Sequence, residues 1–141
     1  MQPRITVLTL GVDDLERSLN FYCDGLGLPT QGIVGKEFEH GAVAFFDLRG
    51  GLRLALFPRS DLARDANVPL GKPGTTEFTL AQNVDSRAEV DAIMQQAKRA
   101  GATITDPAHQ RFWGGYSGYF QDPDGHLWEI AWDPGMHIEE A

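Results

Sequence analysis

The chain has 141 residues, of which 42% are apolar and 23% are charged, enough for the core of one domain or of two small, closely associated halves. Its formal net charge of −8 argues against a nucleic acid or an anionic membrane as a partner, because both require a basic face. No apolar run is long enough to cross a bilayer, no signal peptide is evident, and the single Cys23 cannot form an internal disulfide. We therefore expect a globular, cytoplasmic protein.

The first half of the chain predicts a strand, a helix and three further strands. The β-branched, apolar run at 5–12 is typical of a buried strand. Asp13 and Asp14 offer an N-cap, and Gly25 and Gly27 are expected to end the helix that follows. The other strands are expected within 30–39, at 42–48 and at 52–57. Residues 1–58 then form a first βαβββ module.

Residues 59–74 are interpreted as a linker. Pro and Gly turn signals interrupt this stretch and no period is clear, although one helical turn is expected near 61–64. The linker separates the first module from a second one at 75–133.

The second module repeats the order of the first. A strand is expected at 75–84, and Ser86 with Glu89 predicts a capping box for a helix that Gly101 ends. A strand is then expected at 102–105, followed by a long loop at 106–115. The strands of a final hairpin are expected at 116–121 and 127–132, and a loose acidic tail at 134–141. Asp122 to Gly125, the sequence Asp-Pro-Asp-Gly, supplies the tight turn of that hairpin.

Three landmarks recur after 72 to 75 residues, which indicates a duplicated βαβββ unit. The pairs are Val12 with Val84, Gly27 with Gly101, and Gly50 with Gly125. Neither half is expected to close its own sheet, so the two halves are expected to pack and cover one another.

The stretches 12–22, 26–28 and 120–130 together resemble the vicinal oxygen chelate superfamily, the group of glyoxalase I, bleomycin-resistance proteins and extradiol dioxygenases. The resemblance extends over nearly the whole chain. It implies an α+β fold in which two βαβββ modules form curled mixed sheets around a concave site. Together with the exposed sheet edges of two modules, it also implies a homodimer. The activity stays open, because members include lyases, epimerases, dioxygenases, thiol transferases and drug binders.

Metal-dependent members of that family place a ligand on the first and last strand of each module. The matching positions here are Val7, Leu54 (or Ala55 if the register slips by one), Thr79 with Glu77 two residues earlier, and Glu129. Apolar side chains cannot ligate, and two carboxylates without a third ligand make a weak site for a transition metal. No metal or other cofactor is therefore expected, and a divalent ion at Glu77 and Glu129 is the alternative.

Glu129 is the predicted catalytic residue. In the final strand it alternates with Trp128 and Ile130, so its carboxylate faces the opposite side from the aromatic core. A carboxylate on an inner face is costly unless it is paired or bound to something. The alternative is a structural hydrogen bond to Thr79 or Tyr116.

Four further residues are predicted to bind substrate: Glu77, Thr79, Trp113 and Tyr116. Trp113 and Tyr116 flank two glycines that allow close backbone approach, and the resemblance places this segment at a cavity rim. Packing of Trp113 on the other module is the alternative. Phe45 could line a cavity but core packing is favoured, and Arg53 is expected to face solvent.

The favoured function is the binding of a small, partly apolar molecule without the usual divalent metal. The alternative is a metal-dependent lyase or dioxygenase of the glyoxalase I or extradiol type that uses Glu77 and Glu129. A protein whose sheets serve only assembly ranks third.

Overall fold

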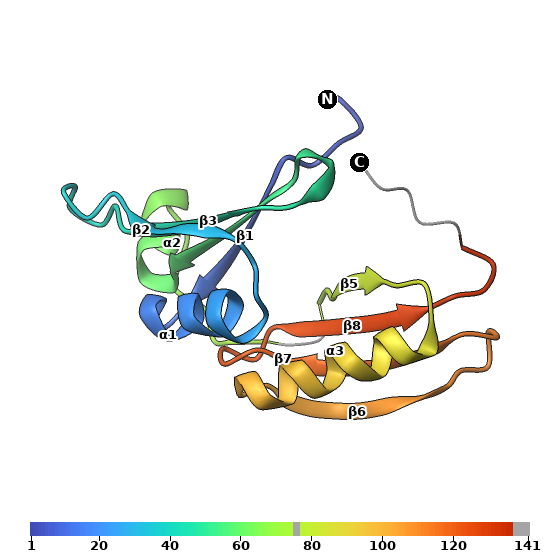
Figure 1. Ribbon diagram of the computed structural model, residues 1–141. Helices are drawn as coiled ribbons and strands as arrows, with labels where there is room; N and C mark the ends of the chain where they lie inside the picture. Colours follow the sequence, from blue (N-terminus) through green and yellow to red (C-terminus); the bar gives the residue numbers. More distant parts are fainter. Residues whose placement is uncertain (75–76, 137–141) are drawn as a thin grey trace. The chain divides into compact units, whose positions relative to one another are not determined.

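The computed structural model describes residues 1–74 and 77–136, and this part of the chain divides between Lys72 and Pro73 into two compact units (Figure 1). That division falls inside the range 59–74. Thr75 and Thr76 of the expected fifth strand, and residues 137–141 of the expected tail, lie outside the described residues.

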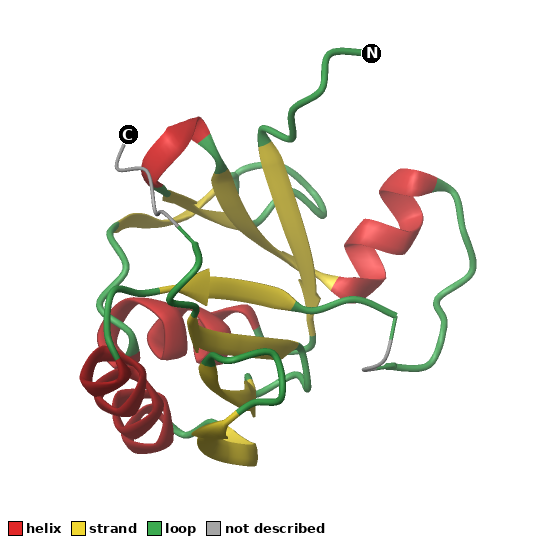
Figure 2. Ribbon diagram, turned by 90° about the vertical axis from the view of Figure 1, so that its right-hand side faces the viewer, coloured by secondary structure: helices red, strands yellow, loops and turns green. Residues whose placement is uncertain are grey.

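The first unit contains a four-stranded mixed sheet in the order β1-β4-β3-β2, in which only the β1–β4 pairing is parallel. Its strands are β1 (Val7–Val12), β2 (Thr30–Val34), β3 (Val43–Asp47) and β4 (Arg53–Pro58). Its helices are α1 (Leu15–Asn20), continued by a π-helical segment (Phe21–Gly25), a 3-10 turn (Arg49–Gly51) and α2 (Arg59–Ala66). Figure 2 shows α2 leaving the end of β4.

The second unit has the same connectivity, with its sheet in the order β5-β8-β7-β6 and only the β5–β8 pairing parallel. Its elements are β5 (Leu80–Asn83), α3 (Arg87–Ala100), β6 (Thr103–Gln110), β7 (Tyr116–Gln121) and β8 (Leu127–Trp132). The predicted α+β fold of two βαβββ modules is thereby confirmed. No helix in the described ranges combines the length and the apolar character needed to cross a membrane.

Local chemistry explains where α1 begins and ends. The carboxylate of Asp14 accepts a hydrogen bond from the Arg17 backbone N–H at 3.1 Å, which satisfies one free donor of the first turn. Gly27 adopts a left-handed φ of 75°, and the chain closes with a bond from the Leu28 N–H to the Tyr22 carbonyl. The helical stretch covers one face of the first sheet, where the buried side chains are Leu10, Val12, Tyr22, Ala44, Phe46, Leu54 and Leu56.

The capping box predicted for α3 is present. Ser86 accepts from the Glu89 N–H at 3.1 Å, and the Glu89 carboxylate accepts from the Asp85 N–H at 3.0 Å. Gly101 ends the helix with a φ of 105°. The apolar stripe of α3 buries Val90, Met94 and Ala97 against the second sheet.

Three elements differ in length from the expectation. The helix α2 has eight residues, about two turns, where one turn was expected. The strand β6 continues through Pro107 to Gln110, because it is an edge strand whose irregular register on either side of Asp106 tolerates a missing N–H donor. The strand β5 begins only at Leu80, so that Glu77 and Thr79 precede the strand on which they were expected.

Candidate functional site

The hairpin of β7 and β8 is held in register by its turn. The nearly buried carboxylate of Asp122 accepts hydrogen bonds from the N–H groups of Asp124 at 2.9 Å and His126 at 2.8 Å. Gly125 supplies the left-handed φ of 87° that the turn requires. This turn sets Tyr119 directly opposite Glu129 on the neighbouring strand.

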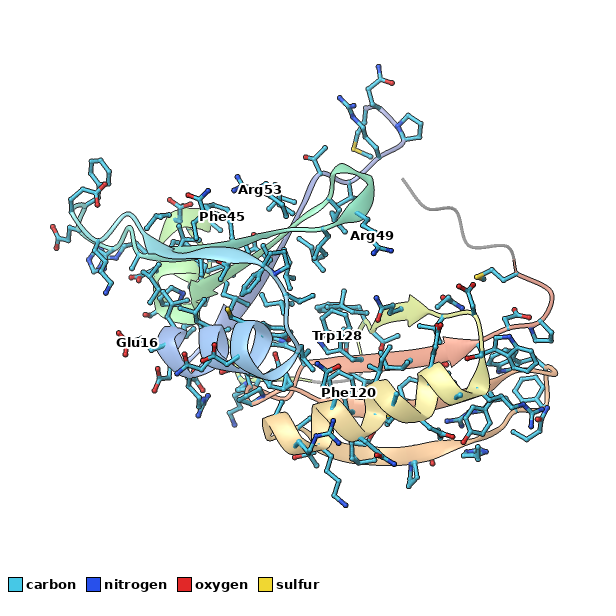
Figure 3. All side chains as sticks on the ribbon, viewed as in Figure 1. Glu16, Phe45, Arg49, Arg53, Phe120 and Trp128 are labelled. Atoms are coloured by element: carbon cyan, nitrogen blue, oxygen red, sulfur yellow. The ribbon has the colours of Figure 1, made fainter. Side chains whose placement is uncertain are left out.

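The two faces of the second sheet differ in what they contact. On the helix face, the Tyr116 hydroxyl donates to Asp91 of α3 at 2.6 Å, and the Arg87 guanidinium lies 5.4 Å from the centre of the Trp132 ring. Phe120 and Trp128 stack with ring centres 6.2 Å apart (Figure 3). The alternate residues of β7 and β8 point to the opposite face, which we call the open face of this sheet: Ser117, Tyr119, Gln121, Leu127, Glu129 and Ala131.

A row of residues in register crosses the open face. It runs from Ala81 on β5 through Glu129 on β8 and Tyr119 on β7 to Asp106 on β6. Tyr119 lies directly opposite the partly buried Glu129, close enough for the Glu129 carboxylate to act on the Tyr119 hydroxyl. Burial raises the pKa of Tyr119, and the negative charge of Glu129 raises that pKa further. Tyr119 therefore remains a neutral hydrogen-bond donor at physiological pH.

Arg111 organises the β6 side of this row. Its guanidinium forms an ion pair with Asp106 at 2.9 Å and donates to the hydroxyl and the carbonyl of Ser117, both at 2.9 Å. The Arg111 guanidinium lies 5.5 Å from the centre of the Tyr119 ring. The hydrogen bond from Arg111, and a weaker one from His109, lower the pKa of Asp106. Asp106 is thus kept ionised, and its carboxylate is paired with the Arg111 guanidinium.

Glu129 and Tyr119 together form the candidate site. The carboxylate can accept several N–H or O–H donors, and the neutral tyrosine hydroxyl beside it can donate one hydrogen bond. On the same face the neighbours of Glu129 along β8 are the half-buried Leu127 and the buried Ala131, both apolar, and of these Leu127 is accessible to a ligand. Such a surface suits a molecule with an apolar body and at least one hydrogen-bond donor.

The structure places the four residues predicted to bind substrate at different points of the second unit. Glu77 is exposed ahead of β5, and the Thr79 hydroxyl donates to the Leu127 carbonyl at 3.1 Å. Tyr116 lies on the helix face, bonded to Asp91. Trp113 is 41% exposed in the β6–β7 loop, and its ring lies so close to Gly115 that any Cβ there would clash with it.

The residue directly opposite Glu129 on β7 was not among those predicted. The alternative interpretation gave it a structural bond to Thr79 or Tyr116, but these hydroxyls bond Leu127 and Asp91, and the residue directly opposite Glu129 is Tyr119. The two-residue alternation that was applied to β8 would, applied to β7, have placed Tyr119 on the open face. Arg111 and Asp106 gave no comparable signal, because the strand that carries Asp106 was expected to be a loop.

The first unit shows what occupies the equivalent position. Ala81 pairs with Glu129 in the second sheet, and Thr9 pairs with Ala55 in the first, at the same distance from the start of each helix. Of the two registers considered for the ligand position, Ala55 is therefore the one that matches Glu129. Leu54 is buried beneath α1, and Val7 is 45% exposed. The open face of the first sheet thus has no carboxylate at this position.

Comparison with known proteins agrees with this architecture. A solved structure described as a glyoxalase-related enzyme from Fulvimarina pelagi is 35% identical, with a TM-score of 0.83 over 97% of this chain and 93% of that one. Lactoylglutathione lyase from Agrobacterium tumefaciens is 27% identical, with a TM-score of 0.68 over 95% of this chain and 98% of its own. The Bacillus subtilis protein YraH is 28% identical over 90% of this chain and 96% of its own length.

The family model of the Glyoxalase/Bleomycin resistance protein/Dioxygenase superfamily matches residues 4–130. This match covers strands of both sheets and extends into β8 as far as Ile130, so that it includes Glu129. The chain belongs to the Glyoxalase/Bleomycin resistance protein/Dioxygenase superfamily.

Proposed function

We propose that this protein binds a small, partly apolar molecule on the open face of its second sheet, at Glu129 and Tyr119, without a divalent metal. The observation that carries the proposal is the register that sets Tyr119 directly opposite Glu129, on a face that also presents the half-buried, apolar Leu127. The pair offers one neutral donor and one acceptor to a ligand whose body packs on apolar neighbours.

The donor set does not fit a divalent ion. A catalytic metal needs about three protein ligands, and the position equivalent to Glu129 in the first unit is Ala55. Glu77, the other carboxylate considered, is exposed and precedes β5. Within residues 1–74 and 77–136, no three His, Cys, Asp or Glu side chains lie together as a metal site requires. We therefore assign no step to a metal.

The test is a ligand-detected NMR screen with small, partly apolar fragments that carry N–H or O–H donors. The screen is run on protein treated with EDTA and on protein supplied with Zn²⁺ or Mn²⁺. We expect the same fragments to bind in both samples, and the purified protein to contain less than about 0.1 equivalent of transition metal. Glu129→Gln should lower the affinity for these fragments by about tenfold, since it removes a charged hydrogen-bond acceptor.

The matched control is Glu16→Gln, which removes a carboxylate from an exposed position of α1 (Figure 3). It should leave fragment affinity unchanged. Glu129→Gln itself should keep its melting temperature within a few degrees, because Gln preserves the shape of Glu and keeps an oxygen that accepts hydrogen bonds. Fragments that bind only after metal is added, with metal content lost in Glu129→Gln, would contradict the proposal.

A further inference from the structure

A separate hollow lies within the first unit. It has a volume of about 350 Å³, the lower part of the range for small-molecule sites, and is lined by residues that include Thr30, Val34, Phe45, Asp47 and Arg53. All of these belong to strands β2, β3 and β4. Figure 3 shows Phe45 and Arg53 on the face of the sheet that points away from α1.

An irregularity in β2 shapes one wall of this hollow. The register between β2 and β3 shifts between Thr30 and Ile33, and Gly32 within this shift has a φ of 84°. The Thr30 hydroxyl stabilises the shifted backbone, because it donates to the Phe45 carbonyl at 2.7 Å and accepts from the Gly32 N–H at 3.1 Å. Such bulges re-aim side chains and occur frequently next to binding sites.

Arg53 is held in place on two sides. Its guanidinium lies 4.1 Å from the centre of the Phe45 ring, and its Nε donates to Asp47 at 2.9 Å. Within the described ranges, its two terminal nitrogens make no hydrogen bond. The side chain is 46% exposed, so it is positioned before any ligand arrives and still reachable from solvent.

We propose that this hollow is a binding site for a small monocarboxylate with an apolar body. A guanidinium that is fixed through Nε presents its terminal nitrogens as a fork, which matches the two oxygens of a carboxylate. The apolar part of the ligand packs on Phe45 and Val34. Asp47 places a negative charge beside the Arg53 guanidinium, and this charge repels a dianion such as phosphate more strongly than it repels a monoanion.

This site stands on the first unit alone and goes beyond the proposed function of Glu129 and Tyr119. The test is an NMR titration of the full-length protein labelled with ¹⁵N, with benzoate, its neutral isostere benzamide, and inorganic phosphate as probes. We expect benzoate to bind saturably with a Kd of about 1 mM, as a fragment of nine heavy atoms can, and to shift the Arg53 Nε–H and Gly32 N–H signals. Benzamide and phosphate should bind at least about fivefold more weakly.

Three variants make the test decisive. Arg53→Gln should lower the affinity for benzoate by about tenfold or more. Arg53→Lys, which keeps the charge but loses the forked pair of donors, should also lower this affinity. Arg64→Gln, at an exposed position of α2, removes the same charge and should leave benzoate affinity unchanged. The absence of saturable benzoate binding, equal affinity for benzamide or phosphate, or equal effects of Arg53→Gln and Arg64→Gln would each overturn the proposal.

Discussion

At Asp106, a single carboxylate links three elements of the second unit. It forms an ion pair with Arg111 in the β6–β7 loop, and it is hydrogen-bonded to His109 on its own strand. In the sheet it lies opposite Tyr119. Because Arg111 also bonds Ser117, which is fully buried on β7, the charge of Asp106 helps to fix the loop against the sheet. The position of Tyr119, and with it the partner of Glu129, depends on this arrangement.

The lowered pKa of Asp106 predicts a specific dependence of stability on pH. The folded pKa lies below the unfolded value of 3.8, so the stabilisation is complete above that value and is lost as the pH falls through the folded pKa. Urea unfolding should find Asp106→Asn less stable than the wild type near pH 7, with the difference shrinking below about pH 4. Asp65→Asn, exposed on α2, is the control for net charge. A difference that stays constant down to pH 2 would contradict the role given to the ion pair.

At the scale of elements, the second unit depends on the close approach of β7 to the helix α3 above the sheet and to the neighbouring strand β6. Gly118 lies where β7 passes beneath α3 and beside β6. A Cβ at this position would lie 2.8 Å from the Met94 side chain and 2.9 Å from the Ala108 backbone nitrogen. The backbone contact cannot be relieved by a change of rotamer, so the glycine sets the separation between the strands.

Gly118→Ala should therefore destabilise the protein by about 1–3 kcal/mol, the cost of overpacking at a site that cannot relax easily. Chemical denaturation followed by tryptophan fluorescence measures this change. Gly71→Ala is the matched control, because nothing lies within 4 Å of a Cβ placed there, and it should change stability by less than about 0.5 kcal/mol. If the two variants are equally stable, the close approach at Gly118 is not a packing constraint.

For the whole molecule, the structure shows two units of identical connectivity, each with a four-stranded mixed sheet. Each sheet ends in two edge strands, β1 and β2 in the first and β5 and β6 in the second. Large apolar side chains are also exposed in the described ranges, among them Val34, Phe38, Phe78 and Phe112. Sheet edges and exposed apolar side chains are features by which protein surfaces associate.

On this basis, and on the resemblance to the family, we propose that the protein is a homodimer. Light scattering at micromolar concentration should give twice the mass of one chain. Phe38→Ser and Phe112→Ser, which place a small polar group at two of the exposed positions, test which surface associates. The monomer mass for the wild type would contradict the proposal.

The sequence by itself determined the order of the elements and their duplication. The Asp-Pro-Asp-Gly turn and the strict alternation after it located β7 and β8 residue by residue, because turn chemistry and side-chain period are local properties. The same holds for α3, whose cap at Ser86 and end at Gly101 are local signals. Glu129 was singled out for the same reason, since alternation alone sets its carboxylate apart from the aromatic residues beside it.

Only the tertiary structure decided which residues meet Glu129. Tyr119 becomes its partner through the register of two strands, and Arg111 becomes important only because β6 continues past Pro107 as an edge strand. In the first unit, likewise, Arg53 was expected simply to face solvent, but register places Asp47 beside its Nε and Phe45 beneath its guanidinium. Pairing between strands joins residues that are far apart in the chain, so no local pattern contains it.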